Sequence, residues 1–162
     1  NPSAKAKAAG APVKADISKI EPGAMIVVEW RGKPVYVVHR TEKQLSLLGD
    51  VENKLSDPGS EVATQQPGYV ADRMRSLRPE LLVIEGLCTH LGCAPTFRPE
   101  VGAADLGGDE WVGGFFCPCH GSKFDLAGRV FSGVPAPTNL VVPPHSFEGD
   151  NILVVGVDAE AA

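Results

Sequence analysis

Two short windows rich in cysteine and histidine constrain this chain more than any other feature of its sequence. The first reads CTHLGC at 88–93, and the second reads CPCHGS at 117–122. Together they hold all 4 cysteines and two of the 4 histidines of the chain. Chance would rarely place six such residues in two short segments, so we interpret the windows as two parts of one site.

The composition limits the fold and the kind of partner. The 162 residues fit one domain, and the hydrophobic fraction of 43% suffices for a packed core. The 18 glycines and 14 prolines favour turns and short strands over long helices. A net charge of −5 without a basic block argues against nucleic acid as a partner. No apolar run reaches the ~18–20 residues needed to cross a bilayer, so we expect the chain as given to be soluble.

The first half of the chain predicts a tether followed by strands. Residues 1–15 are Ala, Lys, Gly and Pro without apolar periodicity, which predicts a flexible tether. The β-branched and aromatic segments 25–30 and 34–40 flank a short turn and predict a hairpin. The apolar segment 81–86 predicts a buried strand that leads directly into Cys88.

Two short helices are predicted between the hairpin and the first window. Thr41 and Gln44 fit a capping box at the start of a helix over 41–48, which Gly49 would end. Apolar residues at helical spacing predict a second helix over 69–77. We expect its basic side chains to form a solvated face: Arg73, Arg75 and Arg78.

The second half predicts more strands. Residues 111–116 lead into the second window, and 123–131 predict a hairpin that turns near Gly128. Segments 140–142 and 151–157 predict closing strands. The overall expectation is a mostly antiparallel β fold with a metal-binding excursion. Roles without chemistry are expected for four further residues: a structural or surface position for His39, a loop position for His145, and core or turn packing for Trp30 and Trp111.

Ligand spacing alone leaves two kinds of metal site open. Four Cys and His ligands on two loops suit either a tetrahedral zinc or a binuclear iron–sulfur cluster. The C-x₄-C spacing at 88–93 comes near a zinc knuckle, but C-x-C-H at 117–120 leaves six candidates for four places. A pair of disulfides would leave both clustered histidines unexplained.

The chain resembles the Rieske iron–sulfur proteins, and specifically the Rieske subunit of cytochrome bc complexes. The resemblance rests on the two windows together, on WRGKPVYVVHRT at 30–41 and on the GVPAP loop at 133–137. It implies a mostly β fold, a Rieske-type antiparallel β sandwich with one or two short helices. The base would comprise 16–86 and 133–162, with a small cluster-binding subdomain inserted at about 87–132.

The resemblance also implies one [2Fe–2S] cluster and a role for each residue of the site. The thiolates of Cys88 and Cys117 would bind one iron, and the imidazoles of His90 and His120 would bind the other and accept a proton. Cys93 and Cys119 would form a disulfide between the loops, and Ser122 would donate a hydrogen bond to a cluster sulfide. Leu91 and Gly92 would dock at the exposed tip. Such a disulfide would imply an oxidising compartment, the periplasm in a bacterium.

Two positions depart from the family pattern. Phe124 stands where many members have a tyrosine whose hydroxyl bonds to a ligand sulfur, and this loss is expected to lower the reduction potential. Val134 is inserted before Pro135 in the proline loop, which alters how that loop covers the cluster.

The mixed ligand set has a physical consequence. Two ferric ions, two sulfides and two thiolates sum to zero charge, so an electron enters more easily than it would with four thiolates. A unit charge ~6 Å away at an effective dielectric of ~20 is worth about 3 kcal/mol. Reduction is therefore expected to strengthen proton binding at His90 or His120.

By resemblance, the chain is expected to be an electron-transfer subunit of a proton-translocating quinol–cytochrome c oxidoreductase. It would take one electron from quinol bound at a cytochrome b subunit, swing on its tether and reduce a c-type cytochrome subunit. The isolated domain would not turn over. A missing N-terminal helix would anchor the full-length protein on the periplasmic side of the bacterial inner membrane.

Other readings remain. The Rieske subunit of an arsenite-oxidase-type enzyme can also keep the disulfide, but the hairpin and proline-loop resemblance argues against it. A Rieske ferredoxin of a dioxygenase is disfavoured because those proteins usually lack the second cysteine pair. A zinc-stabilised interaction module without a redox role is the alternative from another class of protein.

Overall fold

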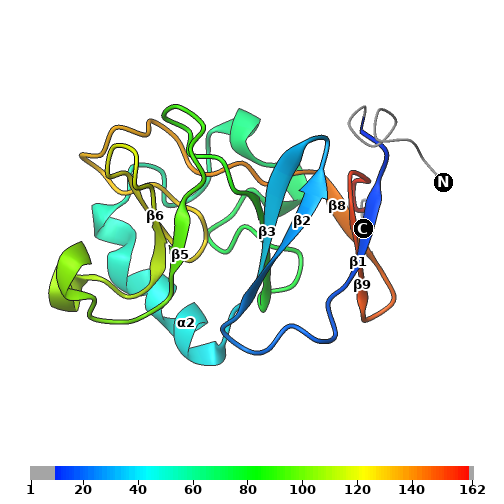
Figure 1. The fold of residues 1–162 in the computed structure, drawn as a ribbon, viewed down its shortest axis with the longest axis horizontal. Coiled ribbons are helices and arrows are strands. Elements are labelled where there is room, and N and C mark those ends of the chain that lie inside the picture. The colour runs from blue at the N-terminus through cyan, green and yellow to red at the C-terminus, as the bar shows by residue number, and fades with distance from the viewer. Residues whose placement is uncertain (1–9, 161–162) are drawn as a thin grey trace.

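The computed structural model describes residues 10–160 and shows three small antiparallel sheets in that range (Figure 1). Their strand orders are β1-β9-β8, β2-β3-β4 and β5-β6-β7. The strands are β1 (Val13–Asp16), β2 (Met25–Trp30), β3 (Lys33–His39), β4 (Leu81–Glu85), β5 (Thr96–Arg98), β6 (Gly114–Phe116), β7 (Lys123–Asp125), β8 (His145–Glu148) and β9 (Ile152–Val155). The helices are α2 (Glu42–Leu47) and the 3-10 turns η1 (Leu48–Lys54), η2 (Ala63–Gln65), η3 (Gly68–Val70), η4 (Ala104–Leu106) and η5 (Gly108–Glu110).

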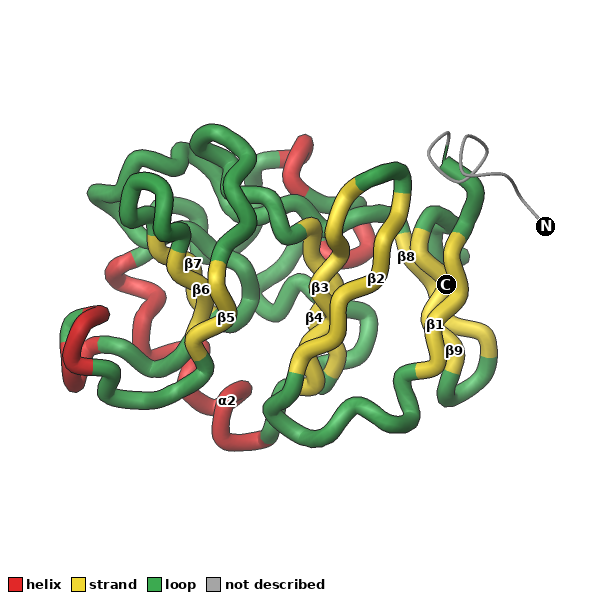
Figure 2. The backbone as a smooth tube through the Cα atoms, viewed as in Figure 1, coloured by secondary structure: helices red, strands yellow, loops and turns green. Residues whose placement is uncertain are grey.

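The sheet β2-β3-β4 lies between the other two (Figure 2). One of its faces, with Leu81 and Val83 of β4, packs with β9 in one apolar cluster. The other face, with Leu82 and Ile84, packs with residues of β6 and β7 in a second cluster. Because both faces are covered, all five residues of β4 are buried, which explains why the first four, Leu81 to Ile84, are apolar. The predicted β sandwich and buried strand are confirmed.

The predicted hairpin and first helix are also confirmed. β2 and β3 pair antiparallel, and Arg31 and Gly32 of the turn have φ of 54° and 72°. Two such residues in succession match a turn whose twist suits a hairpin. At α2, Gln44 N donates to Thr41 Oγ1 (3.1 Å) and Thr41 N donates to Gln44 Oε1 (2.9 Å), which completes the capping box. Gly49 does not end the helical segment, which continues as η1.

The predicted second helix over 69–77 is wrong. Only η3 is helical there, and the carboxylate of Asp72 accepts the backbone N–H groups of Met74 (3.1 Å) and Arg75 (2.8 Å). These bonds offer the backbone an alternative to a helix. The apolar spacing instead arises because Tyr69 and Leu77 pack against the core. Arg75 is fully buried rather than solvated.

The closing strands differ from the prediction at one place. Residues 140–142 form no strand, because their backbone bonds go to separate segments that include Gly128 and Gln65. The closing hairpin is β8–β9. β1 pairs with β9 from Val13 onward, so the end of the predicted tether lies in the base sheet. The rest of that prediction, residues 1–9, falls outside the described residues. No described helix is long and apolar enough to span a membrane.

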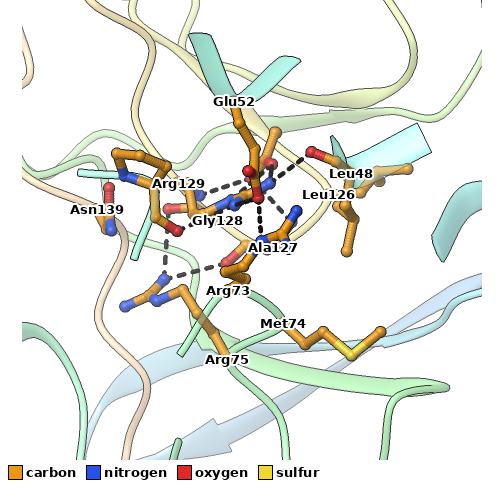
Figure 3. A network of polar contacts seen from close by, with 12 residues as sticks. Leu48, Glu52, Arg73, Met74, Arg75, Leu126, Ala127, Gly128, Arg129 and Asn139 are labelled. Atoms are coloured by element: carbon orange, nitrogen blue, oxygen red, sulfur yellow. Dashed lines mark hydrogen bonds and ion pairs between the residues drawn. The ribbon is translucent and has the colours of Figure 1, made fainter. Parts of the chain in front are cut away.

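Three buried arginines, Arg40, Arg75 and Arg129, hold the turn that follows β7. Figure 3 shows two of them, Arg75 and Arg129. Arg129 is paired with Asp125 (Nη2–Oδ2, 2.7 Å), and both side chains are at most 1% exposed. The carbonyls of the turn accept from the other two guanidinium groups: Leu126 O from Arg40 Nη1 (2.9 Å), and Ala127 O (3.1 Å) and Gly128 O (3.4 Å) from Arg75 Nη1. Burial lowers the pKa of Arg40 and of Arg75 to about 10, so both stay charged at neutral pH. The network fixes the strand that leaves the second window.

We expect Arg129→Met to lower the free energy of unfolding by about 3–5 kcal/mol, because it leaves the buried Asp125 carboxylate without its ion-pair partner. Arg73→Met is the matched control, since Arg73 pairs with the same Glu52 that Arg129 contacts, but its side chain is 64% exposed. The control is expected to cost only a small fraction of that loss. Urea unfolding of both variants is the measurement, and equal losses would contradict the account.

His145 predicts a pH dependence of stability. It is the fully buried first residue of β8, not a loop residue, and burial lowers its pKa. Its contribution is therefore present above the unfolded pKa of about 6.5 and is lost as the pH falls toward the folded pKa. His145→Asn keeps a donor for the Pro143 carbonyl and is expected to flatten the unfolding free energy between pH 5 and 7 relative to the parent. Parallel pH curves would argue against this assignment.

Candidate metal centre

The two windows fold into loops with the same backbone hydrogen bonds. In the first, Cys88 N donates to Cys93 O (2.8 Å) and Gly92 N donates to Cys88 O (2.8 Å). In the second, the corresponding bonds run from Cys117 N to Ser122 O (2.8 Å) and from Gly121 N to Cys117 O (2.9 Å). Gly92 and Gly121 have φ of 85° and 82°, a conformation that favours glycine. Local sequence thus closes both loops in the same way.

A disulfide joins the two loops. Cys93 and Cys119 are bonded across a sequence separation of 26, with Cα atoms 6.5 Å apart. The first loop runs from β4 to β5 and the second from β6 to β7. The structure therefore contains the disulfide that the resemblance implied.

The other two cysteines are buried free thiols. Cys88 and Cys117 are 3% and 2% exposed, and both belong to the apolar cluster that includes Phe115 and Phe124. Burial raises the pKa of Cys88, and the neighbouring Cys117 acts in the same direction, while hydrogen bonds from the His90 backbone and the Ser122 side chain oppose it. The sulfurs of Cys93, Cys117 and Cys119 lie within 4.8 Å of one another, but the disulfide leaves only Cys117 of these as a thiolate ligand.

The two window histidines meet on the solvent side of the thiols. The ring centroids of His90 and His120 are 4.8 Å apart, with the ring planes at 85°. His120 is exposed and His90 is half-buried. The centre therefore has a buried sulfur side and an accessible imidazole side. Beside it, Leu91 is 69% exposed, and Gly92 is also exposed.

Two hydroxyl groups attach the proline loop to the windows. The Oγ of Ser122, which is fully buried, accepts the backbone N–H of Ala136 (2.9 Å). Thr89 Oγ1 donates to Thr138 O (2.6 Å). The sequence predicted a role for Ser122 but none for Thr89, whose only sequence signal is a hydroxyl inside the first window. Both contacts hold residues 133–138 against the centre.

The donor set fits a [2Fe–2S] group with mixed ligands. Two free thiols side by side in an apolar interior would repel one another as thiolates unless cations neutralise them. Two imidazoles lie next to each other at the same end of the loops. Cysteine thiolates on one iron and histidines on the other are the ligands of the mixed class of iron–sulfur centre.

Comparisons with known proteins agree with this donor set. The Rieske [2Fe-2S] domain family matches residues 12–144. A protein of Allochromatium vinosum named ubiquinol-cytochrome c reductase iron-sulfur subunit is 60% identical over 162 residues, which cover 100% of this chain and 77% of that relative. The protein of that name from Bradyrhizobium diazoefficiens is 43% identical over 157 residues, which cover 96% of this chain and 78% of the relative.

A solved structure titled "Hyperthermophilic respiratory Complex III" contains a similar chain, with a TM-score of 0.56, 26% sequence identity and coverage of 94% of this chain and 80% of that one. Fold and donor set define a Rieske [2Fe–2S] protein. The chain belongs, within that class, to the family of ubiquinol–cytochrome c reductase iron–sulfur subunits.

Phe124 offers a test of the centre's electronic tuning. It is fully buried in the same apolar cluster as Cys88 and Cys117. We expect Phe124→Tyr to raise the reduction potential, because a buried phenol next to a thiolate sulfur donates a hydrogen bond that stabilises the reduced state. Phe131→Tyr is the control, since Phe131 packs with Trp111 in a different cluster. Protein-film voltammetry that gives the parent midpoint for Phe124→Tyr would refute this expectation.

Proposed function

We propose that this chain is the electron-carrying subunit of a quinol–cytochrome c oxidoreductase. In this proposal Cys88 and Cys117 bind one iron of a [2Fe–2S] cluster, and His90 and His120 bind the other. The observation that carries the proposal is the donor set of the two loops. Each loop has one buried free thiol and one imidazole, and the two imidazole ring centroids are 4.8 Å apart. The names of the relatives at 60% and 43% identity support the assignment to that complex.

The polarity of the centre suits electron uptake from a quinol. When bound, the cluster supplies a one-electron acceptor with no net charge. The apolar surroundings of Cys88 and Cys117 keep water away from the thiolates. With the cluster bound, the ring nitrogen of His90 or His120 that does not hold iron would accept the proton that the quinol hydroxyl loses with its electron. Both imidazoles lie on the accessible side, where a quinol can reach them.

The exposed tip suits docking to a partner. Leu91 offers an apolar surface beside the imidazoles, and Gly92 lets a partner approach the backbone closely. We assign these two residues to contact with the cytochrome b subunit at the quinol site. The electron then passes to a c-type cytochrome subunit. The cluster-binding part, about 87–132, would contact both cytochrome subunits, and the base fold would support this part.

The disulfide supports a location on the periplasmic side of a bacterial inner membrane. Cys119 is exposed and Cys93 is half-buried, so reductants can reach the bond. Disulfides of this kind persist in oxidising compartments, to which the periplasm belongs.

Electron spin resonance of the cluster-loaded protein tests the ligand assignment. The reduced protein is expected to give a signal with an average g below 2, and the oxidised protein is expected to be coloured. A colourless protein that contains one zinc and gives no such signal after reduction would instead support a zinc-stabilised interaction module.

The midpoint potential against pH tests the proton coupling. A site that takes up one proton with each electron is expected to lose about 59 mV per pH unit. Redox titrations from pH 6 to 10 are the measurement. A flat profile over that range would remove the imidazoles from the proton path while leaving the electron role intact.

A further inference from the structure

We propose that Tyr36 is a positioning residue for the metal centre. Its buried side chain, on β3, contacts Gly86, Pro95 and Phe115. Each of these residues lies two positions from one cysteine of the site: Cys88, Cys93 and Cys117. The inference rests on the proposed ligand roles of Cys88 and Cys117. It adds a support in the base fold that lies outside both windows.

The first contact is made by the hydroxyl of Tyr36. It donates to the carbonyl oxygen of Pro95 at 2.8 Å, across a sequence separation of 59. Pro95 lies two residues after Cys93, where the first loop ends. Burial raises the pKa of Tyr36, so the phenol keeps its proton and remains a donor.

The second contact is made by the ring of Tyr36 at the start of the same loop. A Cβ on Gly86 would lie 2.3 Å from the ring, so this close approach requires glycine. Gly86 lies two residues before Cys88, and its N–H donates to Pro34 O (2.7 Å), which holds the backbone in place. Tyr36 therefore contacts both stems of the first loop.

The third contact leads to the second loop. The ring of Tyr36 stacks on Phe115, with centroids 6.0 Å apart and an interplanar angle of 25°. Phe115 lies two residues before Cys117 in β6, and it also packs on Phe97 at 5.5 Å. One side chain thus fixes the approach to both candidate thiolate ligands.

The position of Tyr36 in the fold makes it a rigid support. It pairs with Val27 of β2 on one side and with Ile84 of β4 on the other, so its backbone is held by both neighbours. A site built on two loops depends on packing and hydrogen bonds from such surrounding residues to keep its ligands in place.

The experiment compares the cluster-loaded parent with Tyr36→Phe, which keeps the ring and removes only the hydroxyl. Cluster loss is followed by visible absorbance at temperatures where far-UV circular dichroism shows that the protein stays folded. We expect loss to be about fivefold faster, because one buried hydrogen bond is removed. The g-values of the reduced centre are expected to change as well. The parent's own signal tests the proposed function separately.

Tyr69→Phe is the matched control. It removes a hydroxyl whose partners are His145 and Asp158, neither of which belongs to either loop. The control is expected to lower the unfolding temperature while cluster loss below that temperature and the g-values stay at the parent's values. Gly86→Ala is a second variant, expected to accelerate cluster loss by displacing the ring. The proposal is overturned if Tyr36→Phe loses its cluster at the parent rate with unchanged g-values, or if Tyr69→Phe accelerates the loss equally.

Discussion

Burial of both faces of the middle sheet at β3 and β4 is the constraint on which the rest of the structure depends. One face packs on the sheet that contains β9, and the other packs on the strands that carry the second window. The residues of β4 that enter the two clusters are therefore apolar, from Leu81 to Ile84. The first window follows that strand directly, so the position of Cys88 is set by the core. The site is an extension of the core and not an appendage to it.

The two windows form loops with equivalent backbone hydrogen bonds, but they attach the centre to different parts of the fold. Each begins with a buried cysteine and ends at a residue that joins it to another segment: Cys93 to the second loop by a disulfide, and Ser122 to the proline loop by a hydrogen bond. The resulting centre keeps sulfur inside and imidazole outside. This separation places the proposed electron acceptor in an apolar medium and the proposed proton acceptor next to solvent.

Three buried arginines, Arg40, Arg75 and Arg129, hold the turn that follows β7, the strand after the second window. Burying three guanidinium groups is costly unless their donors are satisfied. Here one is paired with Asp125, and the carbonyls of the turn accept from the other two. The Gly128 carbonyl also accepts the N–H of Leu140, so side-chain and backbone donors hold the turn together. The strand that carries Phe124 is thereby held at both ends, by the loop before it and by the network after it.

The sequence by itself determined the hairpin, the capped first helix and the buried strand, and it singled out the clustered Cys and His residues as candidate ligands. Each of these depends on local pattern: β-branched residues around a turn, Thr41 and Gln44 at a helix start, and Cys and His within a few positions. Tertiary structure decided the rest. Apolar spacing predicted a helix after Tyr69, but the Asp72 carboxylate accepts the backbone N–H of Arg75 there. Arg75 is buried, and its guanidinium donates to the distant carbonyl of Ala127. The disulfide pairing, the contact between the two histidine rings and the position of Tyr36 join residues far apart in the chain, and spacing carries no information about such contacts.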